Sequence, residues 1–347
     1  MTNAPHPTDA RLTLAARGPG RLALGLLLVG ALLVLLGVSV GSTGLDALWR
    51  LGQDDVAWQI VWDIRLPRSL GAWLAGALLG LAGAVAQGVF RNPLADPFLL
   101  GSASGASLGV ALLLAFMGGS PFASAWVLRL GLTGVAFAGA VLAVLLTLVL
   151  AAGVQQTLRL LLAGVIVGVV LGASTSLVTL MNPDTLQAMQ AFTLGSTGFV
   201  GWNATLLMAA VAGVCVLAAV GLSRVLDGLT LGETTAQSLG LRLAPMRAAL
   251  IGVLALATGT AVAQTGLIAF VGLAAPHLVR SLVKTTHARL LPLTALAGGA
   301  LLLGADVLAR AVLAPQELPV GVLTAVLGGT YLLWLMYQGQ ARLGHQA

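Results

Sequence analysis

Charged side chains are scarce in this chain. Only 8% of its 347 residues are Asp, Glu, Lys or Arg, whereas 58% are hydrophobic. A soluble domain averages about 25% charged residues, so water could not solvate a surface of this composition. The composition therefore predicts a protein that crosses a membrane several times.

The side chains that enzymes use are also rare. Lys284 is the only lysine and no glycine directly precedes it, so the chain lacks the G-x-x-x-x-G-K-[ST] loop that binds nucleotide phosphates. Cys215 is the only cysteine and the four histidines are scattered, which leaves no disulfide framework and no thiol metal site. The sequence has no Ser-His-Asp set and no H-E-x-x-H motif. We therefore expect a chain that is not an enzyme, has no cofactor of its own, and takes energy from a partner if it moves a solute uphill.

Long apolar runs dominate the chain instead. A membrane-spanning helix needs about 20 apolar residues. Ten candidate spans are present, at 22–40, 69–90, 97–117, 124–151, 159–181, 202–222, 246–264, 267–284, 291–309 and 320–338. They form one transmembrane domain, 21–340, between tails at 1–20 and 341–347. The sequence predicts an all-α membrane protein with ten transmembrane helices, the first of them uncleaved because it is longer than the apolar core of a signal peptide, about 7–15 residues.

The basic residues indicate the orientation of the chain. An even number of spans places both termini on one side, which we assign to the cytoplasm. Twelve of the 17 Lys and Arg residues then lie inside and five outside, as the positive-inside rule requires. The opposite orientation would invert this asymmetry.

Glycines spaced four residues apart predict close helix packing. The chain contains 45 glycines. Sets with this spacing are Gly76 and Gly80; Gly101, Gly105 and Gly109; and Gly164, Gly168 and Gly172. Because small residues at this spacing let helix backbones approach closely in lipid, we predict a tightly packed bundle. The tetrapeptide AVAQ occurs at 84–87 and again at 261–264, which leaves open an inverted repeat of the kind that many transporters contain.

A short polar stretch, LTLGETTAQSLGLRL at 229–243, separates two apolar runs. Thr230 and Glu233 fit the S/T-x-x-E capping box that begins a helix, and Gly240 is the residue type that commonly ends one. We predict a helix of about nine residues, 231–239, on the cytoplasmic side. Its apolar face would consist of Leu231, Ala236 and Leu239. On these residues alone the helix is either an idle surface helix in a long loop or a docking element for a cytoplasmic partner.

Three arginines lie at the outer side of the predicted membrane domain. Arg65 and Arg68 flank the proline of the stretch DIRLPR. Their side chains either snorkel to lipid headgroups or present rigid guanidinium forks to carboxylates of a partner. Arg310 lies at the same side, four residues after Asp306, and these two residues could pair with each other on one helix face.

Two proline-containing stretches interrupt the apolar runs. RNPLADPFLLGSASGA, at 91–106, breaks the entry to a span, and irregular backbone at a membrane is tolerated where it meets protein or a water-lined path. GLIAFVGLAAPHLVR, at 266–280, is apolar up to Pro276 and predicts a kinked span.

These stretches, in this order, resemble the FecCD family, the membrane permeases of ABC importers for iron-siderophores, haem and cobalamin. The motifs that carry the resemblance are RLPR, NPLADP, L-x-LG-E-x-x-A-x-x-LG, FVGL-x-x-PH-x-x-R and ELPVG-x-x-TA-x-x-G. The resemblance extends from about Leu22 to Tyr337. The family commonly continues its last motif as GG-P-x-F, whereas this chain reads Gly329-Thr330-Tyr331, which would alter the bend of the last span.

The resemblance implies the assembly of an importer in the cell inner membrane. Two permease subunits, copies or paralogues, would surround one path, with two ATPase subunits below and a substrate-binding protein outside. A ferric siderophore is the commonest cargo of the family, haem and cobalamin are alternatives, and no residue separates the three. The rival interpretations are a secondary transporter or channel that works alone, whose intramembrane charges or polar pore lining are largely absent, and an apolar scaffold without transport.

The resemblance also assigns roles to residues. Coupling to the ATPase would fall to Leu231, Gly232, Glu233, Ala236, Leu239 and Gly240. Docking of the binding protein would involve Arg65, Arg68 and Arg310. The cytoplasmic gate would comprise Asn92, Leu94, Thr157 and Leu158. The helix that slides would pack along Gly164, Gly168 and Gly172.

Overall fold

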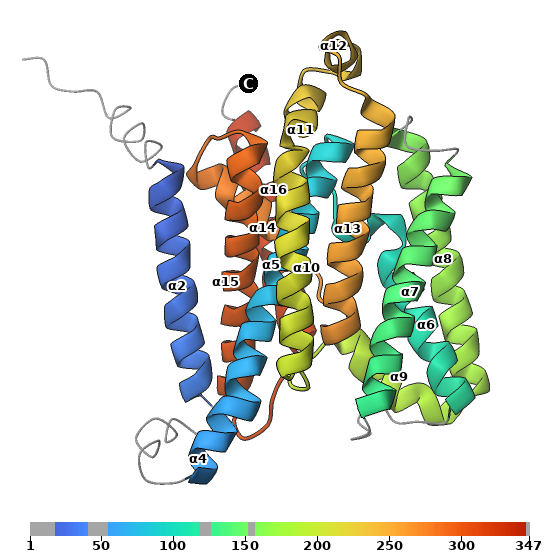
Figure 1. Cartoon of the computed structure of the whole chain (residues 1–347), viewed down its shortest axis with the longest axis vertical. Helices are drawn as coiled ribbons and strands as arrows, with labels where there is room; N and C mark the ends of the chain where they lie inside the picture. The colour runs from blue at the N-terminus through green and yellow to red at the C-terminus, as the bar shows by residue number, and fades with distance from the viewer. Residues whose placement is uncertain (1–17, 41–54, 118–125, 152–156, 345–347) are drawn as a thin grey trace, which may run out of the picture.

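Apolar runs of the expected length fold into helices that lie side by side in the computed structural model (Figure 1). The structure describes residues 18–40, 55–117, 126–151 and 157–344. Within these ranges the elements are helices, with no strand. The predicted all-α fold is therefore confirmed.

The first half of the chain forms long helices linked by short ones. These elements are α2 (Pro19–Ser39), α4 (Asp55–Gln59), the π-helix η1 (Ile60–Arg65), α5 (Leu66–Phe90), the 3-10 turn η2 (Pro97–Leu100), α6 (Ser102–Met117), α7 (Trp126–Leu150) and α8 (Thr157–Met181). The second half contains η3 (Pro183–Thr185), α9 (Leu186–Leu194), α10 (Trp202–Gly221), α11 (Ser223–Thr230), α12 (Glu233–Ser238), α13 (Leu243–Thr265), α14 (Val271–Leu282), α15 (His287–Ala311) and α16 (Val320–Gly344).

Among the described residues, seven helices are long and apolar enough to cross a membrane. They are Pro19–Ser39, Val56–Phe90, Gly131–Leu150, Leu158–Met181, Trp202–Gly221, Leu243–Thr265 and His287–Ala311. Ser102–Phe116 and Val320–Tyr331 are shorter apolar helices. With 12 residues, α14 is about 18 Å long, short of the hydrocarbon thickness of about 30 Å. The count of ten spans stays a prediction.

Two of the predicted spans, 97–117 and 267–284, contain irregular backbone, as the proline-containing stretches indicated. The first is divided into η2 and α6 by a left-handed glycine. In the second, Gly266 and Phe270 adopt positive φ angles, so regular helix begins only at α14. The break therefore precedes Pro276, which lies inside α14 and is buried.

The centre of the bundle is α5, which packs against α15, α13, α14 and α10. Its alanines and glycines allow direct backbone contact. A Cβ atom on Gly76 would overlap the carbonyl of Gly298 in α15, and one on Gly83 would overlap the carbonyl of Gly272 in α14. The predicted tight packing is therefore confirmed for this helix.

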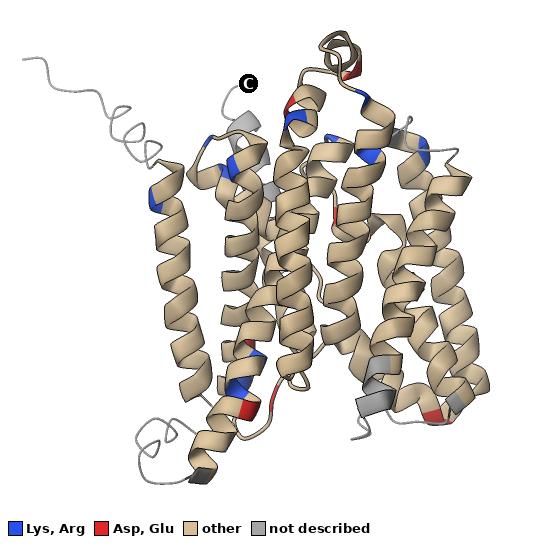
Figure 2. Cartoon of the chain, in the orientation of Figure 1, with Lys and Arg blue, Asp and Glu red and all other residues tan. Residues whose placement is uncertain are grey.

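Most of the charged residues lie near the two ends of the bundle, as Figure 2 shows. We call these the α12 end and the α4 end, after the short helices that mark them in Figure 1. The two helices that carry the AVAQ copies, α5 and α13, contact each other and run in opposite directions (Figure 1). In an inverted repeat, the two matching helices run in opposite directions, as α5 and α13 do. The repeat itself stays a prediction.

Candidate functional site

Two left-handed glycines delimit α12 at the tip of the α12 end. Gly232 has φ +102° and Gly240 has φ +81°, values that residues with a Cβ atom rarely adopt. Gly240 follows the last helical turn, as predicted. The helix has six residues rather than the predicted nine.

The predicted capping box does not form. Thr230 is the last residue of α11, and its hydroxyl donates to the carbonyl of Asp227 at 2.6 Å. Gly232 occupies the N-cap of α12, where no side chain caps the helix. The left-handed turn at Gly232 separates Thr230 from the first helical amides, so the spacing of the motif is satisfied but its geometry is not.

Glu233 forms ion pairs instead of capping the helix. Its Oε1 atom lies 2.6 Å from a guanidinium nitrogen of Arg247 and 3.4 Å from one of Arg91. The Arg247 side chain is buried, at the beginning of α13. Glu233 therefore ties α12 to α13 and reaches toward the end of α5.

The three residues of the predicted apolar face do not share one side of the α12 stretch. Ala236 is fully buried and packs toward Gly228 of α11. Leu231 and Leu239 point outward instead, each with 64% of its surface exposed. Because two large apolar side chains at a polar tip expose surface to water, they are a candidate contact for a partner.

A second polar contact supports α11. The His287 Nδ1 atom lies 2.7 Å from Asp227 Oδ1, and the same oxygen accepts the backbone N–H of His287 at 3.1 Å. Asp227 thereby joins α11 to the beginning of α15. Arg280 of α14 also donates to Gln87 of α5, so the helices at the α12 end are linked by polar side chains.

The predicted gate residues lie at the α12 end. Asn92 and Leu94 follow α5 in an irregular segment, where Asn92 Oδ1 accepts the backbone N–H of Leu94 at 2.9 Å. Leu94 and Leu158 are exposed. Thr157 begins α8, and its side chain lies outside the described residues. A gating role for these four residues stays a prediction.

Only one glycine of the predicted α8 seam makes tight contact. A Cβ atom on Gly164 would overlap the carbonyl of Leu99 in η2. On Gly168 it would come no nearer than 3.8 Å to a side-chain atom of Ser104, and on Gly172 it would meet nothing within 4 Å. The seam is therefore packed at its α12 end and open beyond it within the described part of the chain.

At the α4 end, the buried carboxylate of Asp306 collects three hydrogen-bond donors. Its oxygens accept from Arg68 at 3.1 Å, from Arg310 at 2.6 Å and from the Thr197 hydroxyl at 2.5 Å. These bonds offset the cost of burying a charge. The predicted pair of Asp306 with Arg310 is confirmed, and Arg68 also pairs with Glu317 at 2.9 Å.

Arg65 and Arg310 point into the bundle rather than toward solvent. Arg65 donates to two carbonyls at the end of α2, each at 3.2 Å. Arg310 donates to two more, at 2.7 and 3.2 Å. The last carbonyls of a helix have no partner within it, so the two guanidinium groups satisfy them and complement the helix dipole. The structure brings the three predicted docking arginines together but leaves Arg68 as the most exposed of them; docking itself stays a prediction.

A largely apolar groove between α8 and α9, with several hydroxyl side chains in its lining, was not identified from the sequence. Its volume is about 670 Å³, and no charged residue is among the described side chains that line it. The hydroxyls of Thr175, Ser176 and Thr179 donate to carbonyls one turn earlier, at 2.9–3.2 Å. They therefore present acceptor lone pairs to the groove. The run ASTSLVT within an apolar span was the available signal.

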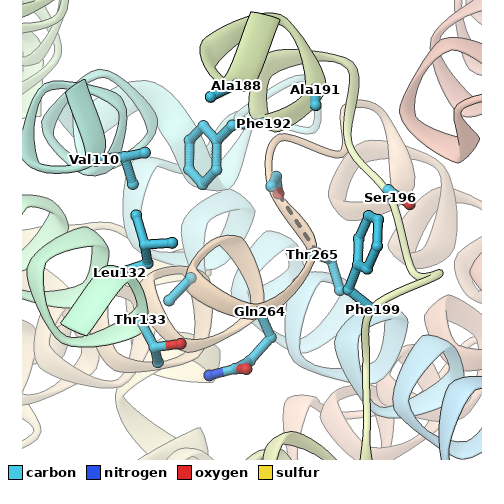
Figure 3. A pocket seen from close by; sticks show the side chains of 12 residues that line it. Val110, Leu132, Thr133, Ala188, Ala191, Phe192, Ser196, Phe199, Gln264 and Thr265 are labelled. Carbon is cyan, nitrogen blue, oxygen red and sulfur yellow. Dashed lines mark hydrogen bonds between the residues drawn. The ribbon is translucent and has the colours of Figure 1, made fainter. Parts of the chain in front are cut away.

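A smaller cavity lies among α6, α7, α9 and α13 (Figure 3). Its volume is about 140 Å³. Phe192, Phe199 and Leu132 line it, together with the polar side chains of Gln264 and Thr133. This space is large enough for several waters but is smaller than a ligand pocket of about 300 Å³. We interpret it as a packing gap.

Known proteins resemble this chain over nearly all of its length. The hemin transport system permease protein HmuU of Yersinia pestis is 38% identical over 324 residues, which cover 91% of this chain and 95% of that protein. The vitamin B12 import system permease protein BtuC of Salmonella typhimurium is 42% identical over 277 residues, 80% of this chain and 83% of that protein. A solved metal-chelate type ABC transporter in an inward-facing conformation has a TM-score of 0.82 at 31% identity, and the match covers 92% of this chain and 99% of that one.

The sequence profile of the FecCD transport family matches residues 26–338. This range includes the left-handed glycines around α12, the exposed leucines beside them and the arginine cluster at the α4 end. The chain is therefore a multi-pass membrane permease of an ABC importer and belongs to the FecCD transport family.

Proposed function

We propose that this chain is a permease subunit of an ATP-driven importer whose cargo is a metal tetrapyrrole such as haem or cobalamin. The observation that carries the proposal is the similarity of almost the whole chain to a hemin permease, with a vitamin B12 permease also among its relatives. Both of those cargoes are metal-bearing macrocycles. This favours a tetrapyrrole over the ferric siderophore that the sequence alone suggested.

The α12 end faces the cytoplasm in this proposal, and both termini lie on that side of the cell inner membrane. The excess of basic residues there supports this orientation. Two separate ATPase subunits hydrolyse ATP, since the chain has no phosphate-binding loop. They cover Leu231 and Leu239, whose exposure in water is otherwise unfavourable. A substrate-binding protein docks at the α4 end, and a second permease, a copy or a paralogue, completes the path.

The groove between α8 and α9 supports a path that does not hold its cargo tightly. Its hydroxyls are already engaged with backbone carbonyls, and no described lining residue is charged. A permease that receives its cargo from a binding protein does not need a strong site of its own. Tight binding in the path would slow release.

Transport in vesicles tests the cargo and the energy source together. The permease is reconstituted with its ATPase and binding protein, and haemin, cyanocobalamin and ferrichrome are offered separately. We expect uptake of haemin or cyanocobalamin that depends on ATP and on the ATPase. Uptake by the permease without the ATPase would contradict the importer, and uptake of ferrichrome alone would contradict the tetrapyrrole cargo.

The docking role of α12 has its own test. Leu231→Ser combined with Leu239→Ser removes two exposed leucines, each worth about 1.5–3 kcal/mol when buried. We expect binding of the ATPase to weaken by at least about tenfold. Leu282→Ser is the matched control, because Leu282 is an exposed leucine at the same end outside the 229–243 stretch. Equal affinities for the double variant and the wild type would exclude this docking surface.

A further inference from the structure

Helix α5 ends at an arginine in a conformation that favours glycine. Arg91 has φ 49° and ψ 36°. Apart from Phe270, no other non-glycine residue in the described ranges has a positive φ angle. A Cβ atom is disfavoured in this conformation, and glycine would end the helix without that strain. An arginine held in this conformation points to a use for its side chain.

The Arg91 side chain reaches the carboxylate of Glu233 in α12. The same carboxylate oxygen accepts from Arg247, so one atom connects α12 with both α5 and α13. The side chains of Arg91 and Glu233 are 42% and 31% exposed. In water such a pair contributes little to stability, so holding the fold together does not explain it.

The segment that follows Arg91 is internally hydrogen-bonded. Asn92 Oδ1 accepts from the Leu94 amide at 2.9 Å, and the Ala95 amide donates to the Asn92 carbonyl at 3.0 Å. Asp96 Oδ1 then accepts from the Phe98 amide at 2.8 Å. These bonds leave the segment few ways to deform, so it transmits a displacement from one end to the other.

The far end of this segment presses on two helices through glycines. Pro97 lies against Gly272 of α14, where an added Cβ atom would come within 2.6 Å of the proline ring. The backbone of Leu99 lies against Gly164 of α8. A displacement of η2 therefore has to move α8 or α14, because only a rigid proline ring in one contact and backbone atoms in the other are available to absorb it.

We infer that Arg91 is a positioning residue that passes the movement of α12 to η2 and, through η2, to α8. The inference rests on the proposed function, since an ATPase subunit has to move α12. When that subunit covers α12, water leaves the surroundings of the Arg91–Glu233 pair and the attraction strengthens. The Arg91–Glu233 contact is then strongest in the state in which α12 has to transmit its movement. That movement reaches the predicted gate residues, which directly follow Arg91.

Three variants at position 91 distinguish the effect of the Arg91 side chain from that of its left-handed backbone. Arg91→Gln removes the charge, Arg91→Lys keeps it, and Arg91→Gly keeps the left-handed backbone and relieves its strain. Arg289→Gln is the matched control, because Arg289 is an exposed cation at the same end of the bundle and forms no ion pair with another described residue. Each variant is assembled with the ATPase and binding protein in vesicles.

The decisive measurement is the ratio of cargo molecules imported to ATP molecules hydrolysed. We expect Arg91→Gln and Arg91→Gly to lower this ratio by between about twofold and thirtyfold, while the affinity for the ATPase stays at the wild-type value and the thermal unfolding temperature does not fall below it. Arg91→Lys retains most of the ratio, and Arg289→Gln retains all of it. Hydrogen exchange gives a second readout: binding of the ATPase changes exchange in residues 98–104 of the wild type but not of Arg91→Gln.

Two results would contradict the inference that Arg91 passes the movement of α12 to η2. An unchanged ratio in Arg91→Gly would show that the side chain transmits nothing. A loss of ATPase affinity that accounts for the whole fall in transport would make Arg91 a docking residue instead. If the wild-type complex itself does not import cargo, the proposed function fails rather than this inference, so the two failures are distinguishable.

Discussion

Helices α5 and α8 have similar sequence patterns, but α5 is buried in the bundle whereas α8 is largely exposed. Each has 25 residues, is strongly apolar and carries glycines four residues apart. Over its 18-residue apolar stretch, the span that contains α5 is 83% buried, whereas that of α8 is 17% buried. Gly76, Gly80 and Gly83 of α5 meet the backbones of α15 and α14, but Gly172 of α8 meets nothing within 4 Å.

This difference shows what a small-residue pattern can and cannot establish. The spacing marks a helix face that another backbone could approach closely. It does not show whether that backbone belongs to the same chain. In α5 the neighbours are within the chain, whereas α8 leaves Val165, Val169 and other large side chains exposed to lipid or to another subunit. The comparison suggests graded consequences for substitutions on the two helices.

The largest expected effect on stability is that of breaking the ion network around Asp306, which holds α5 at the α4 end of the bundle. Asp306→Asn removes the buried carboxylate between Arg68 and Arg310, and an uncompensated buried charge costs about 3–5 kcal/mol. We expect the free energy of unfolding, measured in mixed micelles, to fall by that amount. Arg159→Gln on α8 is the counterpart. Arg159 is exposed and forms no ion pair within the described part of the chain, so we expect a change within about 0.5 kcal/mol. Equal effects would remove the contrast between the helices.

Gly83→Ala tests the packing of α5 directly. The new Cβ atom would overlap the carbonyl of Gly272, so the backbones of α5 and α14 have to separate. Overpacking of this kind costs about 1–3 kcal/mol. The control is Gly252→Ala on α13, where a Cβ atom meets nothing within 4 Å and alanine should stabilise the helix by about 0.5–1 kcal/mol. If the two variants have the same free energy of unfolding, the backbones of α5 and α14 are not in contact.

The sequence predicts the helices better than their ends. Hydropathy located every long helix, because burial in lipid requires a run of about 20 apolar residues. The prolines indicated an irregular entry at 91–106 and a kink within 266–280. They did not give the exact positions of these breaks, at Gly101 and before α14, since those depend on backbone angles such as φ 68° at Phe270 that composition does not record. The capping box failed for the same reason, because Gly232 turns the chain away between its two residues.

The sequence predicted where the residues of the candidate site lie better than it predicted which side chains they contact. Motifs placed the three arginines and the α12 stretch at opposite ends of the bundle, where the structure also has them. They could not show that Arg310 and Arg65 turn inward, because the carbonyls that attract them belong to α2, far away in sequence. The pair of Arg91 with Glu233 was missed for the same reason, since the two residues are 142 positions apart in the chain.

A smaller effect is expected where α8 touches η2. Gly164→Ala places a Cβ atom against the carbonyl of Leu99. Because η2 is a single short turn, it can shift more easily than a full helix, and we expect a loss at the lower end of the overpacking range, about 1 kcal/mol. Unfolding in mixed micelles measures it. A loss as large as that of Gly83→Ala would show that η2 is as firmly fixed as α14.

The smallest effect, and of opposite sign, is expected at Gly172. Alanine there meets nothing within 4 Å and removes the entropic penalty of a helical glycine, so the isolated subunit should gain about 0.5–1 kcal/mol. Uptake by the assembled transporter should stay unchanged, because no described neighbour needs that space. If the subunit is stabilised while uptake falls, another surface approaches Gly172 only in the assembly, and the open half of α8 is a contact that a single chain cannot complete.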